Sequence, residues 1–213
     1  MVIIDIEYSD RYIMITLDSG EHLKIDSVSV PQGLLRKGTE IDIDAYEHIK
    51  EESKLFECKE KALYYIGLRD RSEHEITKYL IKKGFDKNTI YRVIKLFIEK
   101  GFIDDYHYAL QYVRSTHEHK VVGNRVIEKK LFERGIHKSL IKKAIKKMQD
   151  NEPDIERIYQ IAQKKYNRVK GKEHAREKVG LFLQQRGFSW DTIKEVLNRL
   201  GDNNSDNNNF IDD

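Results

Sequence analysis

Apolar and polar residues alternate in three short runs at the start of the chain. The runs are VIIDIEY, RYIMITL and EHLKID, and the SD and DSG segments between them are typical of tight turns. This pattern predicts three antiparallel strands. Residues 27–44 contain Pro31, Gly33 and Gly38, so at most a short helical turn and a fourth strand fit there. A module of this size without disulfides should pack against the rest of the chain.

From about Asp44 the apolar residues follow the helical period, and the pattern then repeats. The stretches EITKYLIKKGFDKNTIYRVIKLF, VIEKKLFERGIHKSLIKKAIKKM and KVGLFLQQRGFSWDTIKEVLNRL align on Gly84, Gly135 and Gly187, which are 51 and 52 residues apart. All three stretches have apolar residues eight and four positions before the glycine, and one, six, nine and thirteen positions after it. The agreement predicts three copies of one supersecondary unit.

Each copy carries the signals of two helices joined by a short turn. The glycine suits a left-handed position at the end of the first helix. Two residues later, Asp86, His137 and Ser189 stand where an N-cap is expected, and SEHE at residues 72–75 has the form of a capping box. A further helical stretch precedes each pair: KEKALYYIGL, YHYALQYVRS and RIYQIAQKKY. The predicted fold is therefore mainly α, with three tandem three-helix repeats of helix-turn-helix-like units after a small antiparallel β module.

The predicted domains are a β-rich module at residues 1–53, the repeats at 54–100, 101–150 and 151–200, and a tail at 201–213. The tail GDNNSDNNNFIDD is acidic and rich in asparagine, so we expect it to be disordered.

The segment GFIDD at residues 101–105 has two interpretations, an acidic site or a joint between helices. We favour the joint, in which Gly101 ends one helix, Phe102 and Ile103 anchor the chain, and Asp104 or Asp105 caps the next helix.

Charge is distributed unevenly along the chain. Residues 1–57 carry 6 Lys and Arg against 13 Asp and Glu, residues 58–200 carry 33 against 19, and the tail carries none against 4. A basic middle between acidic ends indicates a polyanionic partner such as nucleic acid or a nucleoprotein, although lysine-rich solvated helix faces are the simpler alternative.

Residues 120–148 form the most basic stretch, with two acidic residues, Glu128 and Glu133, against ten basic ones. The ten are Lys120, Arg125, Lys129, Lys130, Arg134, Lys138, Lys142, Lys143, Lys146 and Lys147. Lys138, Lys142 and Lys146 recur every four residues and so share one helix face. We expect this face to contact a nucleoprotein or its DNA.

Other classes receive less support from the sequence. There is no phosphate-binding glycine loop, and the single cysteine, Cys58, is expected to pack in a core within a reducing compartment. His117 and His119 in THEHK, which we expect to be a loop, are a weak metal signal. We predict no enzyme activity, metal or cofactor. No run of 18 apolar residues and no basic, apolar leader is present, so we expect a cytoplasmic protein, as a monomer.

The segments ALYYIGLRDRSEHEITKYLIKKGF, GFIDDYHYA and KVVGNRVIEKKLFERGI resemble the RecX family of regulators of the RecA recombinase, closely over residues 58–148 and more loosely elsewhere. The likeness rests on Ala62, Leu63, Arg69, Arg71, Ser72, Glu75, Ile103, Asp104, Asp105, Ala109, Gly123, Arg125, Leu131 and Gly135. The third repeat departs from the family at its entry, where DNEPDIERIY replaces the aspartate pair.

The resemblance implies a non-enzymatic modulator that binds in the groove of the RecA filament on DNA and lowers strand exchange, ATPase and coprotease activity. Under this interpretation Arg69 and Arg71 join the ten basic residues as contacts to the partner or to DNA of any sequence. The alternative is a helical-repeat transcriptional regulator that reads DNA sequence with the second helix of each pair, where lysine and apolar residues predominate instead of the Arg, Asn and Gln that base reading prefers.

Overall fold

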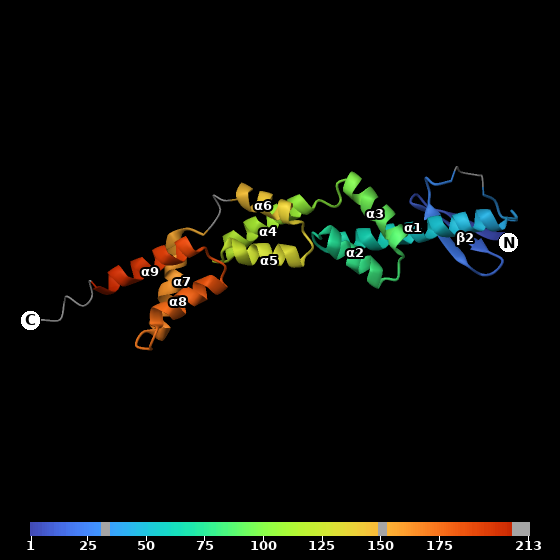
Figure 1. Ribbon diagram of the computed structural model, residues 1–213. Helices are drawn as coiled ribbons and strands as arrows, with labels where there is room; N and C mark the ends of the chain where they lie inside the picture. Colours follow the sequence, from blue (N-terminus) through green and yellow to red (C-terminus); the bar gives the residue numbers. More distant parts are fainter. Residues whose placement is uncertain (31–34, 149–152, 206–213) are drawn as a thin grey trace, which may run out of the picture. The chain divides into compact units, whose positions relative to one another are not determined.

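A computed structural model describes residues 1–30, 35–148 and 153–205 of the chain (Figure 1). The described chain falls into two compact units, residues 1–104 and the residues from Asp105 onward. The five predicted domains stay a prediction, because these units do not test them.

The first unit opens with a three-stranded antiparallel sheet in the order β1-β2-β3. Its strands are β1 (Ile3–Tyr8), β2 (Tyr12–Leu17) and β3 (His22–Asp26). Ile13, Ile15 and Leu17 alternate along β2 and are buried, as the period of two requires. Among the residues that the structure describes there is no fourth strand, and an isolated antiparallel bridge joins Val2 to Glu40. The expected helical turn falls partly on residues 31–34, which lie outside the described residues.

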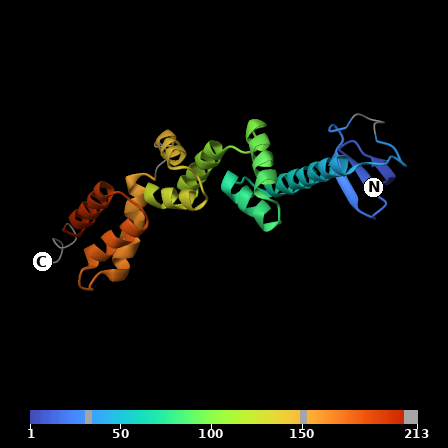
Figure 2. The same cartoon turned by 45° about the vertical axis from the view of Figure 1, so that its right-hand side comes forward.

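Helix α1 (Ile43–Leu68) is 26 residues long and belongs to two cores. Near its start Ile49 packs into the core of the sheet, and farther along Cys58 and Ala62 are fully buried in the core of the first repeat. Between them the Ser53 hydroxyl accepts a hydrogen bond of 3.0 Å from the Lys24 amide of β3. The helix thus runs without a break from the sheet into the first repeat (Figure 2).

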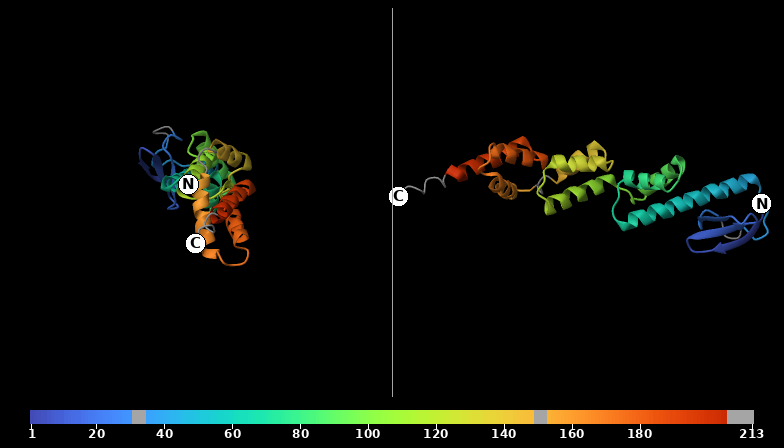
Figure 3. Two further views of the ribbon diagram at one scale, coloured as in Figure 1. Left: turned by 90° about the vertical axis from the view of Figure 1, so that its left-hand side faces the viewer. Right: turned by 90° about the horizontal axis from the view of Figure 1, so that it is seen from below.

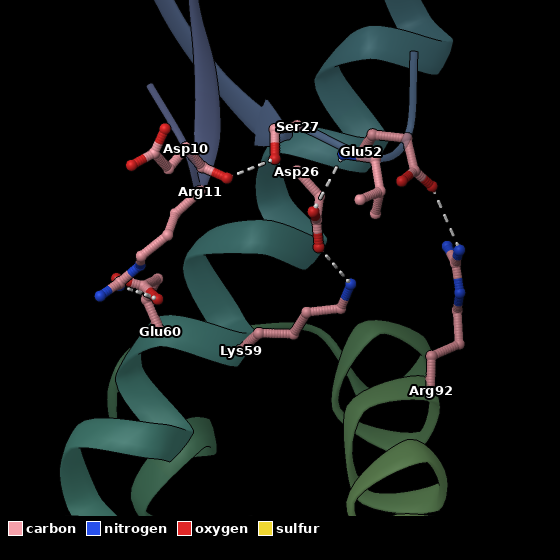
Figure 4. A network of polar contacts seen from close by, with 9 residues as sticks. Asp10, Arg11, Asp26, Ser27, Glu52, Lys59, Glu60 and Arg92 are labelled. Atoms are coloured by element: carbon pink, nitrogen blue, oxygen red, sulfur yellow. Dashed lines mark hydrogen bonds and ion pairs between the residues drawn. The ribbon is translucent and has the colours of Figure 1, made fainter. Parts of the chain in front are cut away.

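Polar contacts also join α1 to the sheet and to α3 (Lys87–Glu99) (Figure 4). They are the ion pairs Arg11–Glu60 at 2.8 Å, Lys59–Asp26 at 3.5 Å and Arg92–Glu52 at 3.3 Å. Each such partly exposed pair contributes about 0–1 kcal/mol. The buried apolar side chains therefore carry most of the stability of this unit.

The three repeats confirm the predicted architecture (Figures 1 and 3). The first combines the end of α1 with α2 (Glu73–Lys82) and α3; the second contains α4 (Asp105–His119), α5 (Asn124–Glu133) and α6 (Lys138–Lys147); the third contains α7 (Ile155–Val169), α8 (Ala175–Gln185) and α9 (Trp190–Ser205). Helix α9 extends five residues into the segment predicted to be disordered, and residues 206–213 lie outside the described part of the chain.

The local signals in each repeat have the expected geometry. Gly84, Gly135 and Gly187 have φ values of 91°, 80° and 84°, in the left-handed region that favours glycine. Ser72 and Glu75 form the reciprocal capping box at the start of α2. These devices end one helix and begin the next within a few residues, which sets the tight pairing of the second and third helices.

The segment at residues 101–105 acts as a joint. Gly101 has a φ of 73°, Ile103 is buried in the core of the first repeat, and α4 begins at Asp105. Phe102 is half exposed and packs edge-on against Phe97, with ring centroids 5.4 Å apart. The two aspartates therefore lie at the start of a helix, where negative charge is stabilised by the helix dipole.

The prediction of a loop at THEHK is wrong, because α4 continues through His119. His117 is only 1% exposed. It follows Ala109 and Val113 at intervals of four, so the helical period places it on the buried face. His119 is exposed on another face of the helix.

Two glycines bring the second and third repeats into backbone contact within the second unit. The Gly123 amide donates to the Arg186 carbonyl at 2.8 Å, and the Arg125 amide donates to the Gly187 carbonyl at 3.4 Å. The Arg186 guanidinium returns a hydrogen bond of 3.0 Å to the Val121 carbonyl. This junction requires the absence of a side chain at Gly123, which is buried against the other repeat.

Candidate nucleic-acid interface

Helices α5 and α6 line an open groove of about 440 Å³ on the second repeat. The lining residues are Arg125, Glu128, Lys129, Phe132, Lys138, Ile141 and Lys142. On α5 the lining side chains recur at intervals of three and four residues, and on α6 they do the same, so each helix contributes one face. The turn at Gly135 holds the two helices side by side and leaves this groove between their exposed faces.

The groove is strongly basic, with four cations against Glu128. Within the described part of the chain, no ion pair involves Arg125, Lys138 or Lys142. Lys129 lies 4.0 Å from Glu133, but both side chains are mostly exposed, so the pair is weak. Positive charge without a close negative partner favours binding of a polyanion.

An aromatic ring lies among these cations. Phe132 is 59% exposed, and the Lys138 ammonium lies 5.7 Å from the centre of its ring. An exposed phenylalanine costs apolar hydration in the free protein, and it offers a flat face to a ligand. The sequence analysis did not include Phe132. Its position on a lysine-rich helix, three residues before the repeat glycine and one after the buried Leu131, is the signal that could have found it.

Six of the other predicted residues lie outside the groove. Lys120, Lys130, Lys146 and Lys147 are exposed. The Lys143 ammonium lies 4.4 Å from the centre of the Tyr106 ring. Arg134 is half-buried, donates to the Tyr108 hydroxyl and lies 4.9 Å from the centre of the Tyr112 ring, so it contacts its own repeat.

Arg69 and Arg71 contact their own repeat as well. Arg69 donates to Glu75 at 2.7 Å and keeps about half of its side chain exposed. Arg71 has 12% of its side chain exposed and lies 4.0 Å from the centre of the Tyr65 ring. Tyr65 in turn stacks on Tyr79, with ring centroids 4.0 Å apart and planes inclined by 6°. The structure thus places Arg71 in an internal stack, whereas Arg69 remains accessible.

The first repeat has the same groove with different chemistry. A groove of about 300 Å³ between α2 and α3 is lined by Glu73, Thr77, Ile81, Lys87, Ile90, Tyr91 and Ile94. With the repeats aligned on their glycines, Ile81 takes the place of Phe132 and Tyr91 takes the place of Lys142. Only one cation, Lys87, remains there, so the first repeat does not share the basic character of this groove.

Other chemistry in the described chain is sparse. The side chains that the structure describes include no group of three or more His, Cys, Asp and Glu arranged to hold a metal ion. Cys58 is fully buried, and this burial, assisted by the Asp86 carboxylate, raises the pKa of its thiol to about 12. No helix in the described residues is long and apolar enough to cross a bilayer.

Three family models match the helical part of the chain. They are described as the first three-helix domain of RecX (residues 58–95), the second (residues 104–145) and the third (residues 152–197). The matched segments correspond to the three repeats of the structure.

Curated relatives and solved structures agree with these matches. Proteins named regulatory protein RecX include one from Clostridium tetani, 31% identical over 78% of this chain and 77% of the relative, and one from Streptococcus uberis, 28% identical over 94% and 77%. A crystal structure of regulatory protein RecX superposes with a TM-score of 0.76 at 25% identity, covering 92% of this chain and 98% of that one. RecX from Lactobacillus salivarius, at 24% identity and a TM-score of 0.63 over 70% of this chain and 97% of that one, shares the fold.

Proposed function

This chain belongs to the RecX family, and on that premise we propose that it regulates the RecA recombinase by binding, without catalysis of its own. In finer detail, we propose that it binds in the groove of the RecA filament on DNA and lowers strand exchange, ATPase and coprotease activity. It acts as a monomer in this proposal.

The observation that carries the proposal is the coincidence of the family match with the basic surface of the second repeat. The matched segment at residues 104–145 contains the groove between α5 and α6, where Arg125, Lys138 and Lys142 have no ion-pair partner among the described residues. A filament assembled on DNA is a dense array of phosphates. Unpaired cations gain most from approaching such a surface, because each phosphate contact releases condensed counterions.

The contact surface we propose is narrower than the set of basic residues in the sequence. It consists of Arg125, Lys129, Lys138 and Lys142 in the groove, with the exposed Lys120, Lys130, Lys143, Lys146 and Lys147 around it. Arg71 and Arg134 are assigned instead to the stacks that hold their own repeats together. Arg69 of the first repeat, about half exposed beside Glu75, stays a proposed contact outside this surface.

Titration of the protein into RecA assembled on single-stranded DNA, with ATP hydrolysis followed over time, tests this function. We expect hydrolysis to fall at regulator concentrations well below that of RecA, with coprotease activity and strand exchange falling in parallel. Unchanged hydrolysis, together with tight and sequence-selective binding to naked duplex DNA, would instead favour the transcriptional regulator. Binding to naked DNA that is independent of sequence and falls steeply with salt reports phosphate contacts alone.

A further inference from the structure

We infer that the groove between α5 and α6 is a binding site for single-stranded nucleic acid, in which one base stacks on Phe132 while the groove cations hold the adjoining phosphates. The inference deepens the proposed function and rests on it, since single-stranded DNA is the polyanion that a RecA filament offers.

The size and openness of the groove suit a strand that passes through it. Its volume of about 440 Å³ lies within the range of roughly 300–1,000 Å³ that is common for small-ligand sites. Its walls are the exposed faces of two helices, so a ligand can extend beyond it on either side.

The cations are placed for phosphates on both walls. Arg125 and Lys129 come from α5, and Lys138 and Lys142 come from α6. A strand lying between the helices would therefore meet positive charge on each side. The guanidinium of Arg125 can hold a phosphate with two hydrogen bonds, whereas each lysine acts as a point charge.

Phe132 supplies the part of the site that charge alone does not explain. Phe132 is 59% exposed and lines the groove together with the four cations, where a lysine or glutamate would be better solvated. The corresponding residues are Ile81 in the first repeat and Gln184 in the third. The first-repeat groove has an aromatic ring, Tyr91, at another position, but only one cation, Lys87. Aromatic rings beside a basic groove are the usual platform for unpaired bases.

The chemistry also separates this ligand from two alternatives. A duplex keeps the faces of its bases covered by their neighbours, so it would use the cations and leave Phe132 without a stacking partner. An acidic peptide would use the same cations and treat Phe132 as an apolar surface, which isoleucine provides equally well. Replacement of Phe132 by the isoleucine of the first repeat therefore removes stacking but keeps apolar bulk and charge.

The test compares the wild-type full-length chain with Phe132→Ile in binding to a labelled oligothymidylate and to an abasic oligonucleotide with the same number of phosphates. We expect Phe132→Ile to weaken binding to oligothymidylate by about 5- to 150-fold, the range that loss of one stacked base produces. Binding to the abasic strand should change by less than about twofold, because the phosphate contacts remain. Lys142→Ala should weaken binding to both strands.

Ile81→Ala is the matched control, because it removes an exposed apolar side chain from the same position of the first repeat. It should leave both affinities unchanged. A second readout uses Phe132→Trp in a Trp190→Phe background, since Trp190 is the only tryptophan of the chain. Stacking predicts that oligothymidylate quenches this fluorescence and that the abasic strand does not.

Equal effects of Phe132→Ile on the two strands, or no effect on either, would overturn the inference. It would also be overturned if a polyglutamate peptide bound the wild type as tightly as oligothymidylate does and Phe132→Ile reduced neither affinity. The proposed function is judged separately by RecA ATPase. If the wild type inhibits RecA ATPase but wild type and Phe132→Ile bind the oligonucleotides with the same affinities, the stacking site alone is rejected. If Phe132→Ile selectively loses oligothymidylate binding but the wild type does not affect RecA ATPase, the RecA function alone is rejected.

Discussion

Gly123→Ala should destabilise the third repeat, because Gly123 packs directly against the backbone of Gly187. A Cβ atom at Gly123 would lie 2.6 Å from the Phe188 amide nitrogen and closer still to the Gly187 carbonyl. These are backbone atoms and cannot rotate away. Gly123 has a φ of −85° and a ψ of 166°, which alanine adopts without strain. The cost of Gly123→Ala therefore comes from separating the two repeats.

Separation would break the hydrogen bonds that join the repeats at this point. They are Gly123 to Arg186, Arg125 to Gly187, and the charged hydrogen bond from Arg186 to Val121. With about 0.5–1.5 kcal/mol for each neutral hydrogen bond and about 1.5–3 kcal/mol for the charged one, Gly123→Ala should destabilise the third repeat by about 2.5–6 kcal/mol.

Urea unfolding followed by tryptophan fluorescence measures this loss. Trp190 is the first residue of α9, so its signal reports on the third repeat. Gly67→Ala in α1 is the control, because a Cβ there meets nothing within 4 Å and alanine favours the helix by up to ~1 kcal/mol. It should leave the Trp190 transition in place. If the unfolding free energy of Gly123→Ala lies within about 0.5 kcal/mol of wild type, the prediction is wrong, because the repeats then do not meet through these glycines.

Further predictions concern the first unit. Ser72→Ala removes the hydroxyl that accepts a hydrogen bond of 3.2 Å from the Glu75 amide, and it should lower the free energy of unfolding, measured by heat or urea, by about 1 kcal/mol. Unchanged stability would contradict the capping role. Arg71→Ala should lower the free energy of unfolding by about 1–3 kcal/mol without altering the inhibition of RecA ATPase at saturation. Unchanged stability together with weaker inhibition would instead make Arg71 a partner contact. Cys58 should react with Ellman's reagent at pH 8 only as fast as the protein opens, and rapid native labelling would contradict its burial. Folding raises the pKa of the Cys58 thiol from 9.0 to about 12, so the folded state binds the proton more tightly than the unfolded state. The free energy of unfolding should therefore fall as pH rises from 9 to 12. Cys58→Ala should reduce this pH dependence.

The architecture was accessible from the sequence because its signals are local and repeated. Helix boundaries are marked by the three glycines, by the Ser72 capping box and by the six shared apolar positions. The repeats are spaced 51 and 52 residues apart, so the boundaries predicted in one repeat can be checked against those in the other two. The continuity of α1 was harder to foresee. Its two halves pack against different cores, so its apolar residues do not form one stripe.

Charge in the sequence could not distinguish surface cations from internal ones. Arg71 and Arg134 resemble their neighbours in the sequence, yet the structure stacks each on tyrosines of its own repeat. His117 shows the converse error, because a polar segment suggested a loop while the interval of four from Val113 placed the imidazole inside. The groove depends on residues from two helices, and a pattern along a single helix does not reveal which side chains meet across it.

The basic surface of the second repeat is tested most directly by charge reversal. Lys138→Glu, Lys142→Glu and Lys146→Glu on α6 are compared with Lys164→Glu, Arg168→Glu and Lys194→Glu, three exposed residues of the third repeat that change the net charge equally. The concentration that halves RecA ATPase on single-stranded DNA is measured for each variant at fixed salt. We expect this concentration to rise by about tenfold or more for the α6 variant and by less than about threefold for the control. Equal inhibition by the two variants would contradict the assignment of filament binding to this surface.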